Sequence, residues 1–253
     1  SAVLSGLVSK GSIFLLLKIF YRVLGRENVV ASRIVNVLFV FGLAGMLMGS
    51  LHAILEKDTR RMIAYSSVAQ IGYIYMGIGL GTEAGMVAAV FHMFTHSATK
   101  ALLFISAVGL YEVSGDKKDY KSLRGAGYRN PLAGIGFSVG ALSMVGFPML
   151  AGFISKLLFA TSALQSPNKM IVTLIGLAVS TTLNAIYFLR LVITLYSREG
   201  DRETRGAKER SAVRKSSWKL RLAVVCFIFL NLVLGLKSQP IVQAIADGLL
   251  MFE

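Results

Sequence analysis

From Pro131 to Ala160 the chain reads PLAGIGFSVGALSMVGFPMLAGFISKLLFA. This apolar run of about 30 residues is long for one membrane-spanning helix, which needs about 20, and short for two helices with a turn. Gly146 and Pro148 stand near its middle, and Gly152 follows them. Because proline lacks the backbone N–H and glycine is conformationally loose, these residues should interrupt helical hydrogen bonding. The run therefore predicts one membrane-spanning helix that is broken near its centre.

Six further apolar runs lie on either side of this one, and each suits a simple membrane-spanning helix. They cover residues 1–20, 32–55, 61–80, 84–112, 168–197 and 218–236. The expected fold class is an all-α integral membrane protein with about seven transmembrane helices, of which the fifth is discontinuous. We expect a transmembrane region over 1–236, with the broken helix at 131–162, and a C-terminal tail over 237–253.

The overall composition agrees with a membrane protein. Hydrophobic residues make up 55% of the 253 positions and charged residues only 16%, whereas soluble domains carry roughly 25% charged residues. This excludes a soluble enzyme. The single cysteine, Cys226, excludes a disulfide framework and any cysteine-based metal site within the chain.

The formal net charge of +14 indicates topology rather than a nucleic-acid partner. If the broken run is one span, 15 basic loop residues share one side of the membrane and five lie on the other; two spans would divide them ten against ten. The positive-inside rule therefore favours one span and places 113–130 and 198–217 in the cytoplasm. The expected location is the cell membrane, which is crossed several times.

Three lysines lie deep inside apolar runs: Lys10, Lys100 and Lys156. A lysine at the centre of a bilayer costs about 2.5–3.5 kcal/mol, so these side chains should face the protein interior or water rather than lipid. Intramembrane lysines usually belong to ion paths, and we expect a functional role. The alternative is a packed and hydrogen-bonded structural role.

The stretch FHMFTHSATKALLF places His92, His96 and Lys100 four residues apart. On a helix this spacing forms one slowly turning stripe, with steps of about 6 Å along the axis. Histidine can accept a proton on one ring nitrogen and release one from the other, so the stripe suits a proton relay. A metal site and a packed, non-conducting stripe are the alternatives. Metal binding is disfavoured because no cysteine or carboxylate lies nearby, and no local nucleotide, flavin or calcium motif predicts a cofactor.

Four segments together resemble one family of membrane proteins. They are SAVLSGLVSKGSIF, LEKDTRRMIAYSSVAQIGYI, FHMFTHSATKALLFISAVGLYE and GFPMLAGFISKLLF. In this order and spacing they are similar to the antiporter-like membrane subunits of respiratory complex I, of Mrp-type Na+/H+ antiporters and of membrane-bound hydrogenases. The resemblance covers roughly residues 1–195 and is strongest to the D-type Mrp subunit or the complex I N-type subunit. It implies the second inverted repeat of a fourteen-helix fold, that is, the C-terminal half of a longer subunit.

The resemblance also implies roles for individual residues. Lys10 matches the lysine that bridges two half-channels, and His92, His96 and Lys100 match the central hydrophilic axis. Lys156 matches the terminal lysine of the broken helix, where the proton is thought to leave. The family's glutamate and lysine pair of the first half-channel has no counterpart here, and no Asp or Glu lies in the middle of any predicted span.

We therefore expect translocation of H+, or of Na+ and H+, within a complex that contains other membrane subunits. The alternative is a non-conducting membrane subunit that anchors a redox or hydrogenase arm. The sequence predicts no redox centre, so any enzymatic activity would belong to the assembled complex.

Overall fold

The computed structural model describes residues 6, 8–197 and 217–250, and nearly all of them are helical. Most of the basic segment 198–217 lies outside this range. Within these described residues eleven elements are α-helices and one, η2, is π-helical, in the order α1 (Ser9–Lys18), η2 (Ile19–Leu24), α2 (Arg26–Ala31), α3 (Ile34–Leu55), α4 (Thr59–Gly79), α5 (Glu83–Glu112), α6 (Ala126–Arg129), α7 (Pro131–Val145), α8 (Ala151–Ala163), α9 (Pro167–Leu195), α10 (Trp218–Leu236) and α11 (Ser238–Leu250). The expectation of an all-α fold is confirmed.

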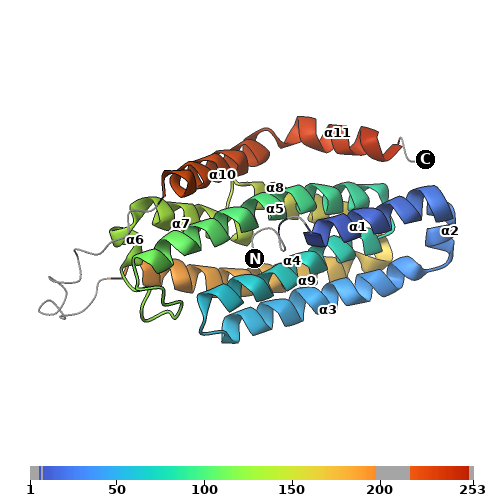
Figure 1. Ribbon diagram of the computed structural model, residues 1–253. Coiled ribbons are helices and arrows are strands. Elements are labelled where there is room, and N and C mark those ends of the chain that lie inside the picture. Colours follow the sequence, from blue (N-terminus) through green and yellow to red (C-terminus); the bar gives the residue numbers. More distant parts are fainter. Residues whose placement is uncertain (1–5, 7, 198–216, 251–253) are drawn as a thin grey trace, which may run out of the picture.

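Helix α5 is the most buried long helix of the bundle and lies among several others (Figure 1). It packs against α4, α7, α8, α10 and α11. Within its most apolar window 72% of the residues are buried, against 22–39% in the other long apolar helices. The polar residues that α5 carries are therefore held inside the protein and away from lipid.

Helices α3 and α4 lie very close together because glycines face one another along their contact. A Cβ atom added to Gly49 would lie 2.5 Å from the backbone nitrogen of Ala69. Additions at Gly42, Gly72 and Gly79 would meet the backbone of the facing helix in the same way. Small residues of this kind allow close helix approach in membranes, where helix association depends on van der Waals packing.

The helix break lies inside the run that the sequence marked. Helix α7 ends at Val145 and α8 begins at Ala151. Gly146 adopts φ 95°, a left-handed conformation that favours glycine. The N–H of Phe147 returns to the Leu142 carbonyl at 2.9 Å and closes the end of the helix. The helix is interrupted within this run, as predicted, and its crossing of the membrane as one broken span stays a prediction.

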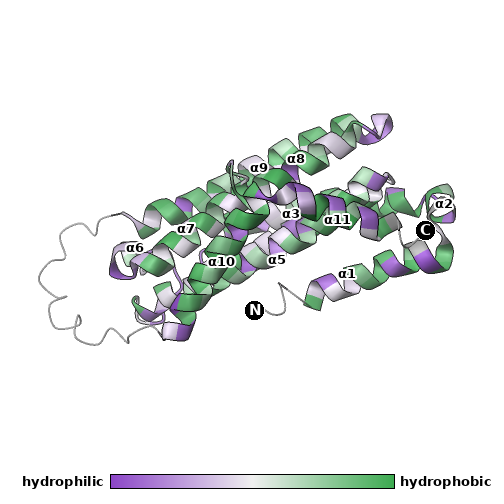
Figure 2. Ribbon diagram, turned by 90° about the horizontal axis from the view of Figure 1, so that it is seen from above, coloured by the Kyte–Doolittle hydropathy of each residue, from purple (hydrophilic) through white to green (hydrophobic). Residues whose placement is uncertain are grey.

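Four described helices are long and apolar enough to cross a membrane: α3, α5, α9 and α10. Helix α4 has 21 residues but a more polar sequence, and α7 and α8 are each shorter than a full span. Hydrophobic residues predominate along many of the helices (Figure 2). Phe41, Ile193 and Phe229 are 67–70% exposed, as lipid contact requires. The count of seven crossings and the inverted repeat stay predictions.

Two elements differ from the expected boundaries. The first helix does not end at residue 20 but continues as η2 to Leu24, which ends at Gly25 in a positive-φ conformation. The expected tail contains α11, which packs back against α5. Pro240 stands in the first turn of α11, where a missing N–H disturbs no helical hydrogen bond.

Candidate functional site

Helix α5 holds the three predicted polar residues in its buried centre. His92, His96 and Lys100 are at most 4% exposed. The two imidazole rings are almost parallel, with an interplanar angle of 2° and centroids 5.9 Å apart. The four-residue spacing thus produces the expected stripe, and the rest of the bundle covers it.

The two histidines retain hydrogen-bonding capacity. His92 Nδ1 lies 2.6 Å from the hydroxyl of Ser155 on α8. Its Nε2 atom, and both ring nitrogens of His96, are buried without a hydrogen-bond partner among the described residues. Buried polar atoms normally have a partner in the protein or in ordered water. The stripe can therefore accept further hydrogen bonds, as a relay must.

Lys100 is fully buried and its described partners are neutral oxygens. Its ammonium donates to the Ile63 carbonyl of α4 at 2.8 Å and to the hydroxyl of Ser66. The ring of Phe188 on α9 lies 6.0 Å from the nitrogen. A carbonyl and a hydroxyl solvate an ammonium without neutralising it, which leaves the amine able to gain or lose a proton.

Lys156 lies at the helix break. Its ammonium donates to the Met144 carbonyl at 2.7 Å, which is one of the last carbonyls of α7. Such carbonyls lack a helical partner, and the negative end of the helix dipole favours a cation there. Gly146 leaves room for this side chain, because a Cβ at that position would lie 2.9 Å from Lys156 Cδ. Tyr73 of α4 presents its ring 5.4 Å from the nitrogen.

Lys10 approaches the stripe from α1. Its side chain is 7% exposed. Ser97 of α5 fixes this side of the bundle by donating to the Gly6 carbonyl at 2.5 Å. Tyr73 of α4 also contacts the stripe, because its ring stacks on the His92 ring with centroids 5.5 Å apart. Tyr73 thus lies between Lys156 and the α5 stripe, and Lys10 lies on α1, which shares a hydrophobic cluster with α5.

A second group of polar residues joins α5, α7 and α10, and the sequence did not reveal it. The side-chain oxygen of Asn231 accepts from Thr99 at 2.7 Å and from Ser143 at 3.1 Å. Ser143 also accepts from the Gly152 N–H at 3.3 Å. A Cβ at Gly152 would overlap the Ser143 carbonyl, so only glycine lets α8 start this close to α7. The signal available in the sequence was an asparagine inside the last apolar run.

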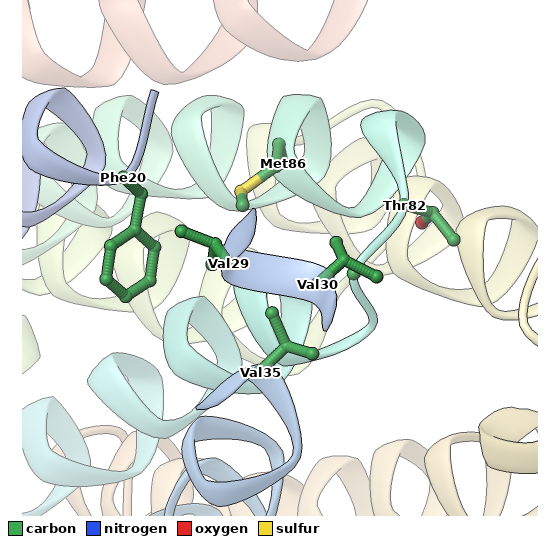
Figure 3. A pocket seen from close by; sticks show the side chains of 7 residues that line it. Phe20, Val29, Val30, Val35, Thr82 and Met86 are labelled. Carbon is green, nitrogen blue, oxygen red and sulfur yellow. The ribbon is translucent and has the colours of Figure 1, made fainter. Parts of the chain in front are cut away.

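The cavities near the surface are apolar. A gap of about 10 Å³ is lined by Phe20, Val29, Val30, Val35, Gly81, Thr82 and Met86 (Figure 3). A wider groove of about 170 Å³ lies between α1, α5 and α11, and Lys18 is the one ionisable residue among those that line it. Neither resembles a pocket for a polar ligand, which would need several convergent polar groups.

Residues 1–183 match the transmembrane family described as NADH:quinone oxidoreductase/Mrp antiporter. The chain is 32% identical over 250 residues to the N-type subunit of the NADH-quinone oxidoreductase of Desulforudis audaxviator, covering 96% of this chain and 49% of that protein. It is 28% identical over 253 residues to the D-type subunit of the Na(+)/H(+) antiporter of Alkalihalophilus pseudofirmus, covering 99% and 49%. The chain spans about half the length of these curated relatives.

Solved structures have the same fold. A chain in the Mrp complex from Dietzia sp. superposes with a TM-score of 0.83 at 24% identity, over 98% of this chain and 52% of that one. A chain of respiratory complex I from Thermus thermophilus gives 0.66 at 28% identity, over 83% and 45%. Both are subunits of membrane complexes, and this chain is likewise a multi-pass protein of the cell membrane. The fold, the polar stripe and the sequence match agree, and the chain belongs to the NADH:quinone oxidoreductase/Mrp antiporter transmembrane family.

Proposed function

We propose that this chain carries protons across the membrane along a buried line formed by Lys10, His92, His96, Lys100 and Lys156. The observation that carries the proposal is the pair formed by the fully buried Lys100 and the half-buried Lys156, whose described hydrogen-bond partners are carbonyl and hydroxyl oxygens. A lysine that is locked into a structural ion pair stays charged. A lysine that is held by neutral oxygens can exist in both charge states, as proton transfer requires.

The direction of proton movement follows from the predicted membrane topology. Protons would enter from the cytoplasm toward the α5 stripe, exchange laterally with Lys10 and leave past Lys156 at the helix break. Discontinuous helices near the bilayer midplane form the ion sites of many transporters. Repulsion between neighbouring positive charges would couple successive transfers, because Coulomb interactions are strong where water is excluded.

The complete activity would involve more than this chain. The antiporter relative of Alkalihalophilus pseudofirmus carries Na+ and H+ in its name, and Na+ transport is the second possibility for the translocated ion. The named complexes among the structural neighbours suggest partnership with other membrane subunits. We assign 1–236, including the break within 131–162, to the translocating region and treat 237–253 as its C-terminal tail.

The decisive test compares two lysines that bind helix ends in the same way. Lys156 donates to Met144 at the end of α7, and Lys169 donates to the Gly79 carbonyl at the end of α4, at 2.6 Å. Lys156→Ala and Lys169→Ala would be placed in the full-length subunit within its assembled complex. Proton uptake into inverted membrane vesicles would be measured with a ΔpH-sensitive dye.

We expect Lys156→Ala to abolish uptake while the complex still assembles, and Lys169→Ala to retain it. Normal uptake by Lys156→Ala would overturn the proposal and favour the alternative of a non-conducting anchor. Thiol labelling separates the two further. Cysteines placed at positions 10 and 156, in a chain whose Cys226 is replaced by serine, should react with a water-soluble reagent if the line is hydrated.

A further inference from the structure

The two halves of the broken helix bind each other's ends. The ammonium of Lys156, in the second turn of α8, donates to the Met144 carbonyl in the last turn of α7 at 2.7 Å. In the opposite direction, the N–H of Gly152, in the first turn of α8, donates to the hydroxyl of Ser143 on α7 at 3.3 Å. Each half thus supplies a hydrogen-bond partner to the terminus of the other. The proposed line of proton carriers uses only the first of these two contacts.

The contact made by Lys156 depends on the charge of its side chain. A hydrogen bond from a charged donor is roughly twice as strong as one between neutral groups. The bond to the Met144 carbonyl therefore weakens whenever the amine gives up its proton. A lysine that carries protons cannot by itself hold the two half-helices together with the same strength throughout transport.

The contact made by Ser143 does not depend on charge. The first N–H groups of a helix have no partner within the helix and commonly bind a side-chain oxygen. Leu150, which directly precedes α8, supplies no such oxygen, and Ser143 supplies one from the preceding helix. A serine hydroxyl and a backbone N–H do not ionise near neutral pH. This contact therefore persists when Lys156 is neutral.

The Ser143 hydroxyl is itself held in position. The residue is fully buried, and its hydroxyl donates to Asn231 Oδ1 on α10 at 3.1 Å while it accepts from Gly152. The same Asn231 oxygen accepts from Thr99 at 2.7 Å. Thr99 directly precedes Lys100 on α5. The start of α8 is thus fixed to α10 and, through Asn231, to the helix that carries the histidine stripe.

The position of Gly152 determines where Lys156 points. The two residues are four positions apart on α8, so they lie one above the other on the same helix face. A Cβ at Gly152 would overlap the Ser143 carbonyl, which shows how closely this face approaches α7. Holding the Gly152 N–H against α7 therefore also keeps the Lys156 side chain directed at the end of α7.

We propose that Ser143 is a positioning residue that keeps Lys156 at the end of α7 in both charge states of the lysine. Ser143 carries no proton across the membrane, and it acts through Lys156 by holding the first turn of α8. The proposal rests on the proposed function, because it requires Lys156 to change its charge during transport. The broken helix then has one contact that follows the charge of the lysine and one that does not.

The test compares two serines of α7 in the full-length subunit within its assembled complex. Ser143→Ala removes the hydroxyl that binds Gly152 and changes no charge. Ser138→Ala is the matched control, because the described hydrogen bond of that hydroxyl goes to the Gly134 carbonyl of its own helix, at 2.9 Å. Ser143→Cys keeps a similar shape with a weaker hydrogen-bonding group. Initial rates of proton uptake into inverted vesicles would be measured over a range of pH and normalised to the amount of assembled complex.

A positioning role predicts a specific set of rates. Ser143→Ala should lower the maximal rate by about threefold to tenfold, the range for one lost hydrogen bond. It should also change the pH at which the rate is half-maximal, because the surroundings of Lys156 change when the start of α8 is released. Ser143→Cys should lie between the wild type and Ser143→Ala in both properties. Ser138→Ala should change neither.

Three results would overturn the role of Ser143. They are a normal rate in Ser143→Ala, a lower rate with unchanged pH dependence, and a rate in Ser143→Cys below that of Ser143→Ala, which would mean that side-chain size decides. If Ser143→Ala does not assemble, Ser143→Cys carries the test, and a normal pH dependence in that variant overturns the proposal.

The proposed function fails in a different way. If Lys156→Ala leaves uptake unchanged, the proposed function itself is wrong. If Lys156→Ala abolishes uptake and Ser143→Ala has no effect, only the role of Ser143 is wrong.

Discussion

The ammonium of Lys156 donates to the carbonyl of Met144 at 2.7 Å, across the break that separates α8 from α7. The break thus frees the carbonyl that binds the lysine. An uninterrupted helix would have used that carbonyl in its own hydrogen bonding. Breaking the helix and placing an intramembrane cation are, in this protein, two parts of one arrangement.

Gly146 should be sensitive to the smallest side chain. Gly146→Ala places a Cβ 2.9 Å from Lys156 Cδ and holds an alanine at φ 95°, which costs about 1–3 kcal/mol. We expect lower thermal stability and strongly reduced proton uptake. Gly248→Ala is the control, because no atom lies within 4 Å of the added Cβ. Equal behaviour of the two variants would contradict the packing described for Lys156.

The contact between α3 and α4 should depend on particular glycines. Gly49→Ala directs a Cβ to 2.5 Å from the Ala69 nitrogen, whereas at Gly45 the nearest atom would lie at an ordinary 3.5 Å. Backbone on both sides cannot yield without moving the helices, so Gly49→Ala should destabilise the subunit by about 1–3 kcal/mol. Gly45→Ala should be nearly neutral. Melting temperatures in detergent would compare the two, and a neutral Gly49→Ala would refute the close approach.

Ser155 should orient His92. Because its hydroxyl lies 2.6 Å from His92 Nδ1, Ser155→Ala should lower proton uptake by about threefold to tenfold, as expected for one lost hydrogen bond of about 1 kcal/mol. Ser155→Thr keeps a hydroxyl and should restore most of the rate. If the threonine variant behaves like the alanine variant, the effect comes from packing rather than from the hydrogen bond.

Asn231 should hold α10 against the bundle. Asn231→Leu removes the acceptor that the buried hydroxyls of Thr99 and Ser143 share, and the loss of these hydrogen bonds costs about 1–3 kcal/mol. The expected result is a lower melting temperature of the purified subunit. The exposed Thr161, which bonds only within its own helix, supplies Thr161→Val as control. A larger loss of stability in the control would contradict this role of Asn231.

Local chemistry explains why several features could be read from the sequence. Gly146 and Pro148 weaken helical hydrogen bonding wherever they occur, and the helix does break beside them. Long apolar runs predict buried or lipid-facing helices, and α3, α5, α9 and α10 follow them closely. The four-residue spacing of His92, His96 and Lys100 defines one helix face before any packing is known.

Other features were not accessible. The helix α11, the π-helical end of the first helix and the partners of Lys100 were not predicted. The same holds for Asn184 and Asn231, because a polar residue in an apolar run shows that a partner is needed but not which helix supplies it. Most of the basic segment 198–217, which decided the predicted topology, lies outside the described residues.

The sequence by itself determined that the chain is a helical membrane protein, where one helix must break, and which ionisable groups lie inside apolar runs. These properties depend on hydropathy, backbone chemistry and spacing within a single helix. Only the tertiary structure decided that Lys156 meets Met144, that Lys100 meets Ser66, and that Asn184 of α9 meets Ser50 of α3. Such contacts depend on how helices that are far apart in the chain are rotated and spaced relative to one another. Glycine contacts and side-chain packing together determine that geometry.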